Sequence, residues 1–202
     1  MANVDAPFGL TPVQYAWGTS YDGRARPYIA LSSYATALFI GDPVIITGTS
    51  NTTEVRGFPP GTLPTINKAT AGTANKITGV IVGFLPLSGA ESTTYGAAST
   101  TRIALVADNP NLLFAIQDDA SATLDATVVG SNANVIFTVA GSIYTGRSGV
   151  ELDATTPAQA AADQLSIISL LDRPNNEGGA SAIWLVRINN HTYSPGIVGA
   201  AV

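Results

Sequence analysis

The sequence predicts an all-β, β-dominated fold: a compact β-sandwich or barrel-like domain with an extended N-terminal arm, long polar loops and one or two short helices. Charged residues make up only 11% of the 202 residues, less than half of the roughly 25% usual in soluble domains, whereas exposed helices need Glu, Lys and Arg. The 20 Gly and 12 Pro place turns along the whole chain. Short apolar runs between these turns have the spacing typical of sandwiches and barrels.

The first 27 residues form a segment of their own, in which three prolines alternate with large apolar side chains. Proline disfavours a regular helix and favours extended backbone, while the apolar side chains favour burial. Two interpretations follow. The segment is either an irregular first strand packed on the chain's own core or an arm that docks on another subunit and adds main-chain hydrogen bonds to it. Residues 28–202 are interpreted as a single β-rich domain.

From residue 28 on, short apolar runs predict the strands. Their ranges are 28–30, 34–40, 44–46, 77–85, 102–107, 112–117, 135–140, 150–152, 165–171 and 182–188. Gly79 and Gly83 indicate a bulge or a close approach of a neighbouring strand. Helix is expected only at 120–129, as one or two turns ended by Gly130, and as a short turn at 157–162.

Segments rich in Thr, Asn, Gly and Pro predict two long surface loops, at 47–76 and 88–100. A hairpin-like reversal is expected at 108–111, where the sequence is Asp-Asn-Pro-Asn. The apolar segment 195–199 predicts a flexible C-terminal tail. Long loops in compact domains are usually functional or mobile, so both polar loops are candidate binding surfaces.

The charge pattern argues against nucleic acid and membrane partners. The net charge is −5, and among the nine Lys and Arg only Arg24 and Arg26 form a close pair, whereas a nucleic-acid binder needs a basic stripe. The most apolar stretch, 77–87, is interrupted by Gly and Pro and is too short to cross a bilayer. Residues 1–7 lack the basic and apolar regions of a secretory signal, so we expect synthesis in the cytoplasm.

Residues that carry chemistry are sparse. There is no Cys, so thiolate sites are absent, and the single His191 lies among Asn and Thr, which favours a structural hydrogen-bonding role. Trp184 lies in an apolar run and is expected in the core. Four carboxylates fall in one stretch, where turns and helix caps are favoured over a calcium site or a glycosidase pair; they are Asp108, Asp118, Asp119 and Asp125. No catalytic residue, metal site or cofactor is therefore predicted.

Four segments resemble small structural proteins of tailed bacteriophages. They are residues 1–13 (MANVDAPFGLTPV), 33–44 (SYATALFIGDPV), 130–134 (GSNAN) and 186–191 (VRINNH). This group supplies head decoration (cement) proteins, which sit on the assembled capsid. The resemblance implies a β-rich protein that binds the outside of the phage head, commonly as a dimer or trimer. It also implies bridging of neighbouring coat subunits, often through an extended N-terminal arm.

The resemblance further implies a partner, the major capsid protein, and a location on the capsid exterior of the virion after synthesis in the host bacterial cytoplasm. The candidate capsid contacts are assigned by position in the arm, with the two arginines as partners for coat carboxylates. They are Phe8, Leu10, Val13, Tyr15, Trp17, Arg24 and Arg26.

The leading hypothesis is thus a non-enzymatic virion protein that stabilises the capsid by binding the assembled lattice and not the loose subunits. The alternative is a receptor- or carbohydrate-binding module of a phage tail or fibre, with the polar loops and aromatics such as Tyr95 and Tyr144 as its binding surface. A major coat protein ranks lower, because the chain is short and lacks a long helical segment. An enzyme ranks last.

Overall fold

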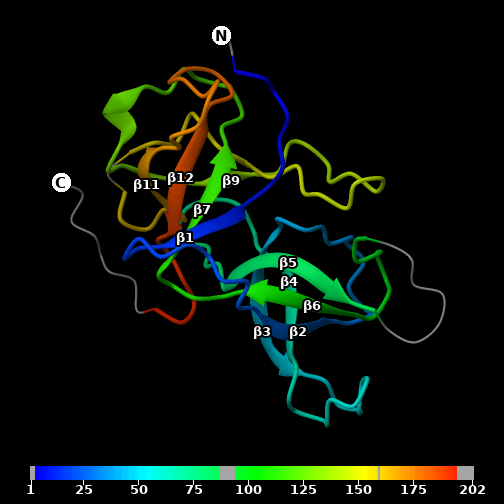
Figure 1. Cartoon of the computed structure of the whole chain (residues 1–202). Helices are drawn as coiled ribbons and strands as arrows, with labels where there is room; N and C mark the ends of the chain where they lie inside the picture. Colours follow the sequence, from blue (N-terminus) through cyan, green and yellow to red (C-terminus); the bar gives the residue numbers. More distant parts are fainter. Residues whose placement is uncertain (1–2, 87–93, 159, 195–202) are drawn as a thin grey trace.

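The computed structural model describes residues 3–86, 94–158 and 160–194, and within them the protein is nearly all β (Figure 1). The predicted all-β class is confirmed. The strands are β1 (Thr11–Tyr15), β2 (Arg26–Ala30), β3 (Pro43–Ser50), β4 (Pro64–Lys68), β5 (Gly79–Leu85), β6 (Arg102–Ala107), β7 (Leu112–Gln117), β8 (Asn132–Ala133), β9 (Val135–Ile136), β10 (Glu151–Leu152), β11 (Leu165–Leu170) and β12 (Ile183–Ile188). The predicted tail at 195–199 lies outside the described residues.

The strands form an open sheet and a closed barrel, so of the two expected architectures the barrel is present, beside an open sheet. The sheet has the order β1-β7-β12-β11-β8 and is antiparallel throughout. The barrel has the order β2-β4-β3-β5-β6, with β2 and β4 as its parallel pair. In Figure 1 the sheet lies above the barrel, and β9 pairs with β10 beside it.

One apolar cluster contains the sheet residues and extends to Val80 of β5 in the barrel, and two further clusters consist of barrel residues and their neighbours. Beneath the sheet, Phe114, Trp184 and Val186 are fully buried, and the core of the barrel is built around side chains such as Ile66 and Val106. Strands buried on both faces need continuous apolar runs, which is why the sequence predicts β6, β7 and β12 within a residue of their observed bounds. The prediction for β11 is as close, although this strand is only partly buried.

Two glycines act as the sequence predicts. A Cβ on Gly79 would lie 2.5 Å from the carbonyl oxygen of Ala107, so only glycine lets β5 and β6 approach this closely. The register of the same pair shifts between Ile81 and Gly83, which is a β-bulge.

Several predicted elements differ from the observed ones. The segment 47–76 is not one loop, because β3 continues to Ser50 and β4 lies within it; Ile66 alone carries most of the apolar character of β4, so its strand signal is weak. No strand forms at 34–40, where Leu38 and Ile40 make only isolated bridges. The helix expected at 120–129 is reduced to one 3-10 turn, Ala126–Val128, because Ala120 has φ of +54° and both Asp125 and Val129 are extended.

The turn expected at 157–162 is not helical in its described residues, and the strand expected at 135–140 ends at Ile136. Among the described residues, no helix has the length and apolar character needed to cross a membrane.

The chain passes between barrel and sheet at two adjacent places, and these position the candidate site. Residues 16–25 connect β1 of the sheet to β2 of the barrel, and residues 108–111 connect β6 of the barrel to β7 of the sheet. The reversal at 108–111 is therefore a crossover and not a hairpin between paired strands. The two connections touch, since the amide of Ala16 donates a 2.8 Å hydrogen bond to the carbonyl of Asn111.

Candidate functional site

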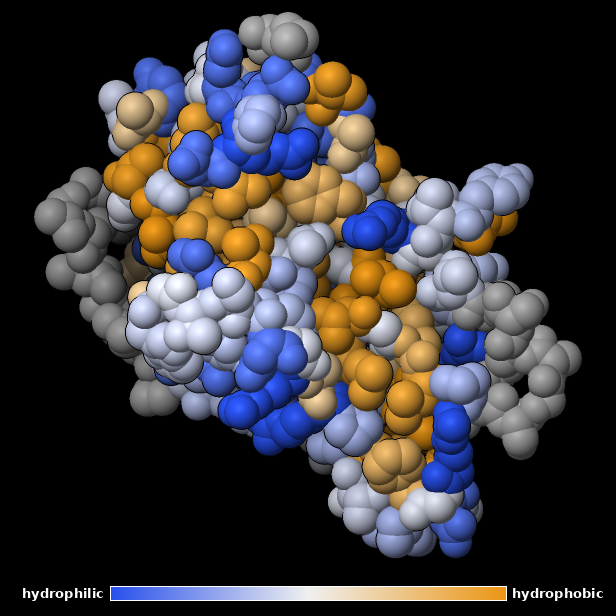
Figure 2. Space-filling view, in the orientation of Figure 1, coloured by the Kyte–Doolittle hydropathy of each residue, from blue (hydrophilic) through white to orange (hydrophobic). Residues whose placement is uncertain are grey.

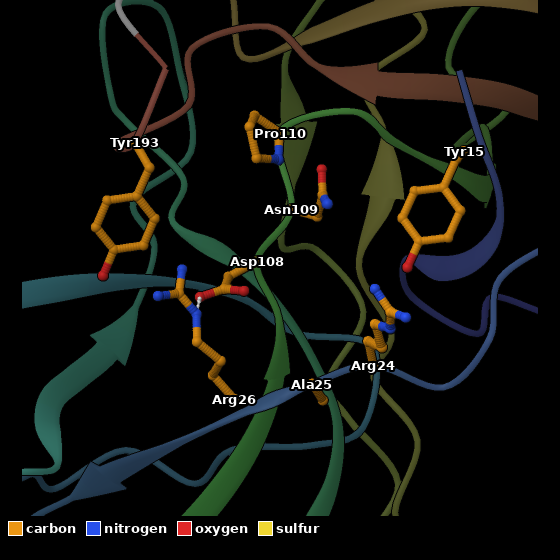
Figure 3. Close-up of a pocket in the computed structure, with 8 residues that line it drawn as sticks. All are labelled: Tyr15, Arg24, Ala25, Arg26, Asp108, Asn109, Pro110 and Tyr193. Carbon is orange, nitrogen blue, oxygen red and sulfur yellow. Dashed lines mark hydrogen bonds and ion pairs between the residues drawn. The ribbon is translucent and has the colours of Figure 1, made fainter. Parts of the chain in front are cut away.

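A cavity of about 530 Å³ opens between these two connections. Figure 3 shows side chains from both connections and from the chain after β12 pointing into one space. Its lining residues are Tyr15, Arg24, Ala25, Arg26, Asp108, Asn109, Pro110 and Tyr193. Three of the seven candidate contact residues, Tyr15, Arg24 and Arg26, thus line the same cavity.

One side of the cavity is organised by the carboxylate of Asp108. Its Oδ2 accepts hydrogen bonds from Arg26 Nε at 2.5 Å and from the Tyr28 hydroxyl at 2.6 Å, and the two hydroxyls of Tyr28 and Tyr193 are 3.0 Å apart. The Arg26 guanidinium lies 5.2 Å from the centre of the Tyr193 ring, within cation–π range. Burial and the bond to Asp108 raise the pKa of Tyr28 well above its usual value, so this hydroxyl stays protonated as a donor.

The other side is organised by Asp22. It accepts a 2.8 Å hydrogen bond from the Tyr15 hydroxyl and pairs with Arg24 Nε at 2.9 Å. The bond from Tyr15 lowers the pKa of Asp22 despite its desolvation, so the carboxylate is charged at neutral pH. Each arginine of the cavity is therefore held through its Nε by a carboxylate of this chain.

Trp17 extends from the turn that follows β1. Its ring stacks on Tyr15 with 4.9 Å between centroids and 2° between planes, yet the residue is 63% exposed. The turn is closed by a 2.8 Å hydrogen bond from the amide of Gly18 to the carbonyl of Tyr15, and Gly18 has φ of +93°, which favours glycine. The exposed indole is thus supported by a buried ring.

The candidate contact residues differ in how far they are exposed. Leu10 is 1% exposed and belongs to the apolar core, while Phe8 and Val13 are half-buried. Leu10 is therefore corrected from a capsid contact to a core residue, because its side chain does not reach the surface. Trp17, Arg24 and Arg26 are exposed.

The main chain of β1 is bonded within this protein on both edges. One edge pairs with β7, and on the other the amide of Tyr15 donates to the carbonyl of Thr19 and that of Tyr21 to the carbonyl of Val13. Of the two interpretations of residues 1–27, the first strand packed on the chain's own core describes the observed conformation. An arm that adds main-chain hydrogen bonds to another subunit would first have to break these bonds.

The carboxylates singled out in the sequence act in turns and buried networks. Asp118 accepts from the amides of Ser181 and Ala182 at 2.8 and 3.0 Å and from the Trp184 indole at 3.0 Å, while burial raises its pKa. Asp125 caps the 3-10 turn by accepting from the amide of Thr127. Among residues 3–86, 94–158 and 160–194, no group of three His, Cys, Asp or Glu could hold a metal ion.

The structure also places His191 and the two loop tyrosines that the sequence analysis named. His191 is 1% exposed and its Nδ1 accepts a 3.0 Å hydrogen bond from the amide of Tyr193, which fits the predicted structural role. Tyr95 is half-buried and stacks on Phe39 at 5.2 Å. Tyr144 is 91% exposed and lies midway along the sequence of the loop between β9 and β10. This loop projects from the body in Figure 1.

Sequence reasoning missed Tyr193 and misjudged the place of Asp108. Both belong to the cavity, but they lie 165 and 80 residues from Tyr28, their shared partner. No local pattern signals that contact. The Arg24 and Arg26 pair is the one sequence signal that pointed to this place.

No known protein family, curated protein or solved structure matches this chain. The resemblance to phage decoration proteins, with its implied partner and location, therefore stays a prediction.

Proposed function

We propose that this protein is a non-enzymatic structural component of a tailed-phage virion that binds the outside of the assembled capsid and bridges coat subunits. Its partner is the major capsid protein, and it acts as a dimer or trimer on the capsid exterior. The observation that carries the proposal is Trp17, a large aromatic side chain that is 63% exposed and held by stacking on Tyr15.

Such an arrangement is typical of residues that dominate protein interfaces. Trp, Tyr and Arg are the residues most enriched at interface hot spots, and Trp17 lies on the same connection as Arg24, with Arg26 beginning the next strand. Stacking on a buried ring fixes the indole before binding, so less conformational entropy is lost when a partner covers it.

The backbone also favours docking through side chains over strand addition. The barrel is closed, and a closed barrel has no free edge. Both edge strands of the sheet are bonded to neighbouring segments, β1 to residues 19–21 and β8 to Ala158. A protein that reads an assembled lattice through side chains stabilises it by mass action, and many copies multiply a modest affinity.

The first test is co-sedimentation of the purified protein with mature capsids and with unassembled coat subunits. We expect saturable binding to capsids alone. Trp17→Ala should lower the affinity by about tenfold or more, a typical hot-spot loss. Tyr144→Ala removes an aromatic elsewhere that is even more exposed, and this variant should bind as the unmodified chain does. Absence of binding to either form of the coat would refute the proposal.

A second candidate function, a receptor- or carbohydrate-binding module, is favoured by Tyr144. Exposed aromatic rings on projecting loops stack on sugar faces, and loops carry much of the binding surface of rigid scaffolds. In this case a glycan array is positive, Tyr144→Ala abolishes the signal and Trp17→Ala leaves it unchanged. The two functions therefore predict opposite results for the same pair of variants.

A further inference from the structure

We propose that the cavity lined by Arg24, Arg26 and Tyr193 binds a carboxylate side chain, Asp or Glu, on a segment of the coat protein. The inference rests on the proposed function for the identity of the partner, and on the geometry of the cavity for the chemistry of the contact.

The two guanidinium groups present their outer edges to the cavity. Arg24 Nε is paired with Asp22 and Arg26 Nε with Asp108, so one nitrogen of each group is used. Within the part of the chain that the structure describes, the terminal Nη atoms of both make no further hydrogen bond or ion pair. Two terminal N–H groups side by side match the two oxygens of a carboxylate.

The Arg26 guanidinium is held in place before any ligand arrives. The buried carboxylate of Asp108 binds its Nε, and the Tyr193 ring supports its face at 5.2 Å. The Arg24 side chain is 85% exposed and is restrained only by its surface ion pair with Asp22. Figure 3 shows Arg24 and Arg26 on the same floor of the cavity, between the rings of Tyr15 and Tyr193. A preorganised site loses less entropy on binding than a pair of free surface arginines does.

The other lining groups fit the same ligand. Asn109 Oδ1 accepts from the amide of Asn111 at 2.9 Å, which leaves its side-chain nitrogen as a donor. Pro110 and the two tyrosine rings provide apolar walls for the methylene groups of an acidic side chain. Asp22 and Asp108 offset the charges of the two guanidiniums, so recognition of a carboxylate relies on directed hydrogen bonds from the Nη atoms.

Size and location favour a protein segment over a free anion. A volume of about 530 Å³ is within the range of pockets that hold a whole small molecule, and far exceeds one carboxylate. The wall formed by Tyr15 continues into the exposed Trp17, so a chain whose acidic side chain enters the cavity would place a neighbouring residue against that indole. Figure 2 shows that apolar patches bordered by polar residues lie over both the barrel and the sheet on this face.

The test uses two variants of the full chain and one control. Arg24→Gln removes one fork, and Asn109→Asp keeps the acceptor for the Asn111 amide while adding a negative charge to the cavity. Arg173→Gln removes an exposed positive charge at another cavity and serves as the matched control. Unchanged melting temperatures of all three show that the folds are intact; a variant that fails this check is replaced by Arg24→Lys, which retains the charge but loses the fork.

The first measurement is capsid co-sedimentation at low and at moderate salt. We expect each cavity variant to lose about tenfold or more in affinity, and more at low salt, while the control is unchanged. If the unmodified protein binds capsids and the cavity variants bind equally well, the cavity inference is overturned and the proposed function stands.

The second measurement needs no capsid. The ¹⁵N-labelled protein is titrated with the capped peptide Ac-Glu-Leu-Glu-NH₂, with its Gln counterpart, and with glucuronic acid. Shifts at Arg24, Arg26 and Asn109 that appear with the Glu peptide alone support the cavity inference, even if the chain fails to bind capsids and the proposed function falls. Shifts with glucuronic acid alone, or with neither acid, overturn it.

Discussion

Two buried ionisable groups give the stability of this protein opposite pH dependences. Glu151 in β10 is 3% exposed, and burial together with the carboxylates of Asp5, Asp119 and Asp118 raises its pKa from 4.5 to about 7. His191 is 1% exposed, and burial lowers its pKa from 6.5 to about 4.

The sign of each effect follows from which state binds more protons. Between about pH 4.5 and 7 the folded protein keeps the proton of Glu151 and the unfolded chain has lost it, so the free energy of unfolding falls as pH rises. Between about pH 6.5 and 4 the unfolded chain binds a proton at His191 that the folded protein does not, so the free energy of unfolding falls as pH drops. Over most of this range the two effects oppose each other.

Their magnitudes are similar, because each pKa moves by about 2.5, which corresponds to about 3 kcal/mol as an upper bound. The assay is urea unfolding at half-unit steps from pH 4 to pH 8. Relative to the unmodified chain, Glu151→Gln should gain nothing at pH 4 and about 2–3 kcal/mol at pH 8.

His191→Asn offers an acceptor in place of Nδ1 and should show the reverse. The difference in the free energy of unfolding between His191→Asn and the unmodified chain should shift by about 2–3 kcal/mol in favour of the variant from pH 8 to pH 4. A difference curve for Glu151→Gln that stays level across the range would refute the reasoning, because it would mean that the carboxyl group is hydrated in the folded protein. A level curve for His191→Asn would do the same for the imidazole.

Three further predictions concern packing. Trp184→Ala should lower the free energy of unfolding by about 3–5 kcal/mol, since the fully buried ring also donates to Asp118; an unchanged thermal melt would contradict this. Gly79→Ala should cost about 1–3 kcal/mol, because its Cβ would meet the Ala107 carbonyl, whereas Gly48→Ala, which meets nothing within 4 Å but has φ of +81°, should cost less in the same melt. Deleting residues 1–20 should destabilise the whole fold, because it removes the buried Leu10 and Tyr15 and uncovers an edge of β7; a truncated chain with an unchanged melting temperature would show that β1 is dispensable.

Strands buried on both faces were predictable from the sequence because their signal is local. Residues 102–107 and 182–188 are almost entirely apolar, and burial in a sheet requires that composition wherever the strand finds its partner. Gly79 and Gly83 likewise predict the close approach and the bulge between β5 and β6. By contrast, the sequence predicts a loop at β4, because Thr, Asn and Lys surround Ile66 and their pairing with β3 depends on closure of the barrel.

Only some residues of the candidate site can be predicted from the sequence. Arg24 and Arg26 are the one close basic pair in a chain of low charge, but no local signal indicates Asp108, the carboxylate partner of Arg26, or Tyr193 beside it. Asp108 lies 82 residues from Arg26, and the chain returns to it only because 108–111 crosses between barrel and sheet.

The all-β class, the buried strands, the close-packed glycines and the low charge can be predicted from local sequence, because each depends on the composition of a short segment and its preference for burial or for a turn. Long-range pairing divides the strands into a closed barrel and an open sheet, pairs residues 11–15 within the chain, and brings two arginines and two tyrosines around one cavity. Those outcomes depend on which strands pair across many residues, and pairing is selected by the packing of the whole core.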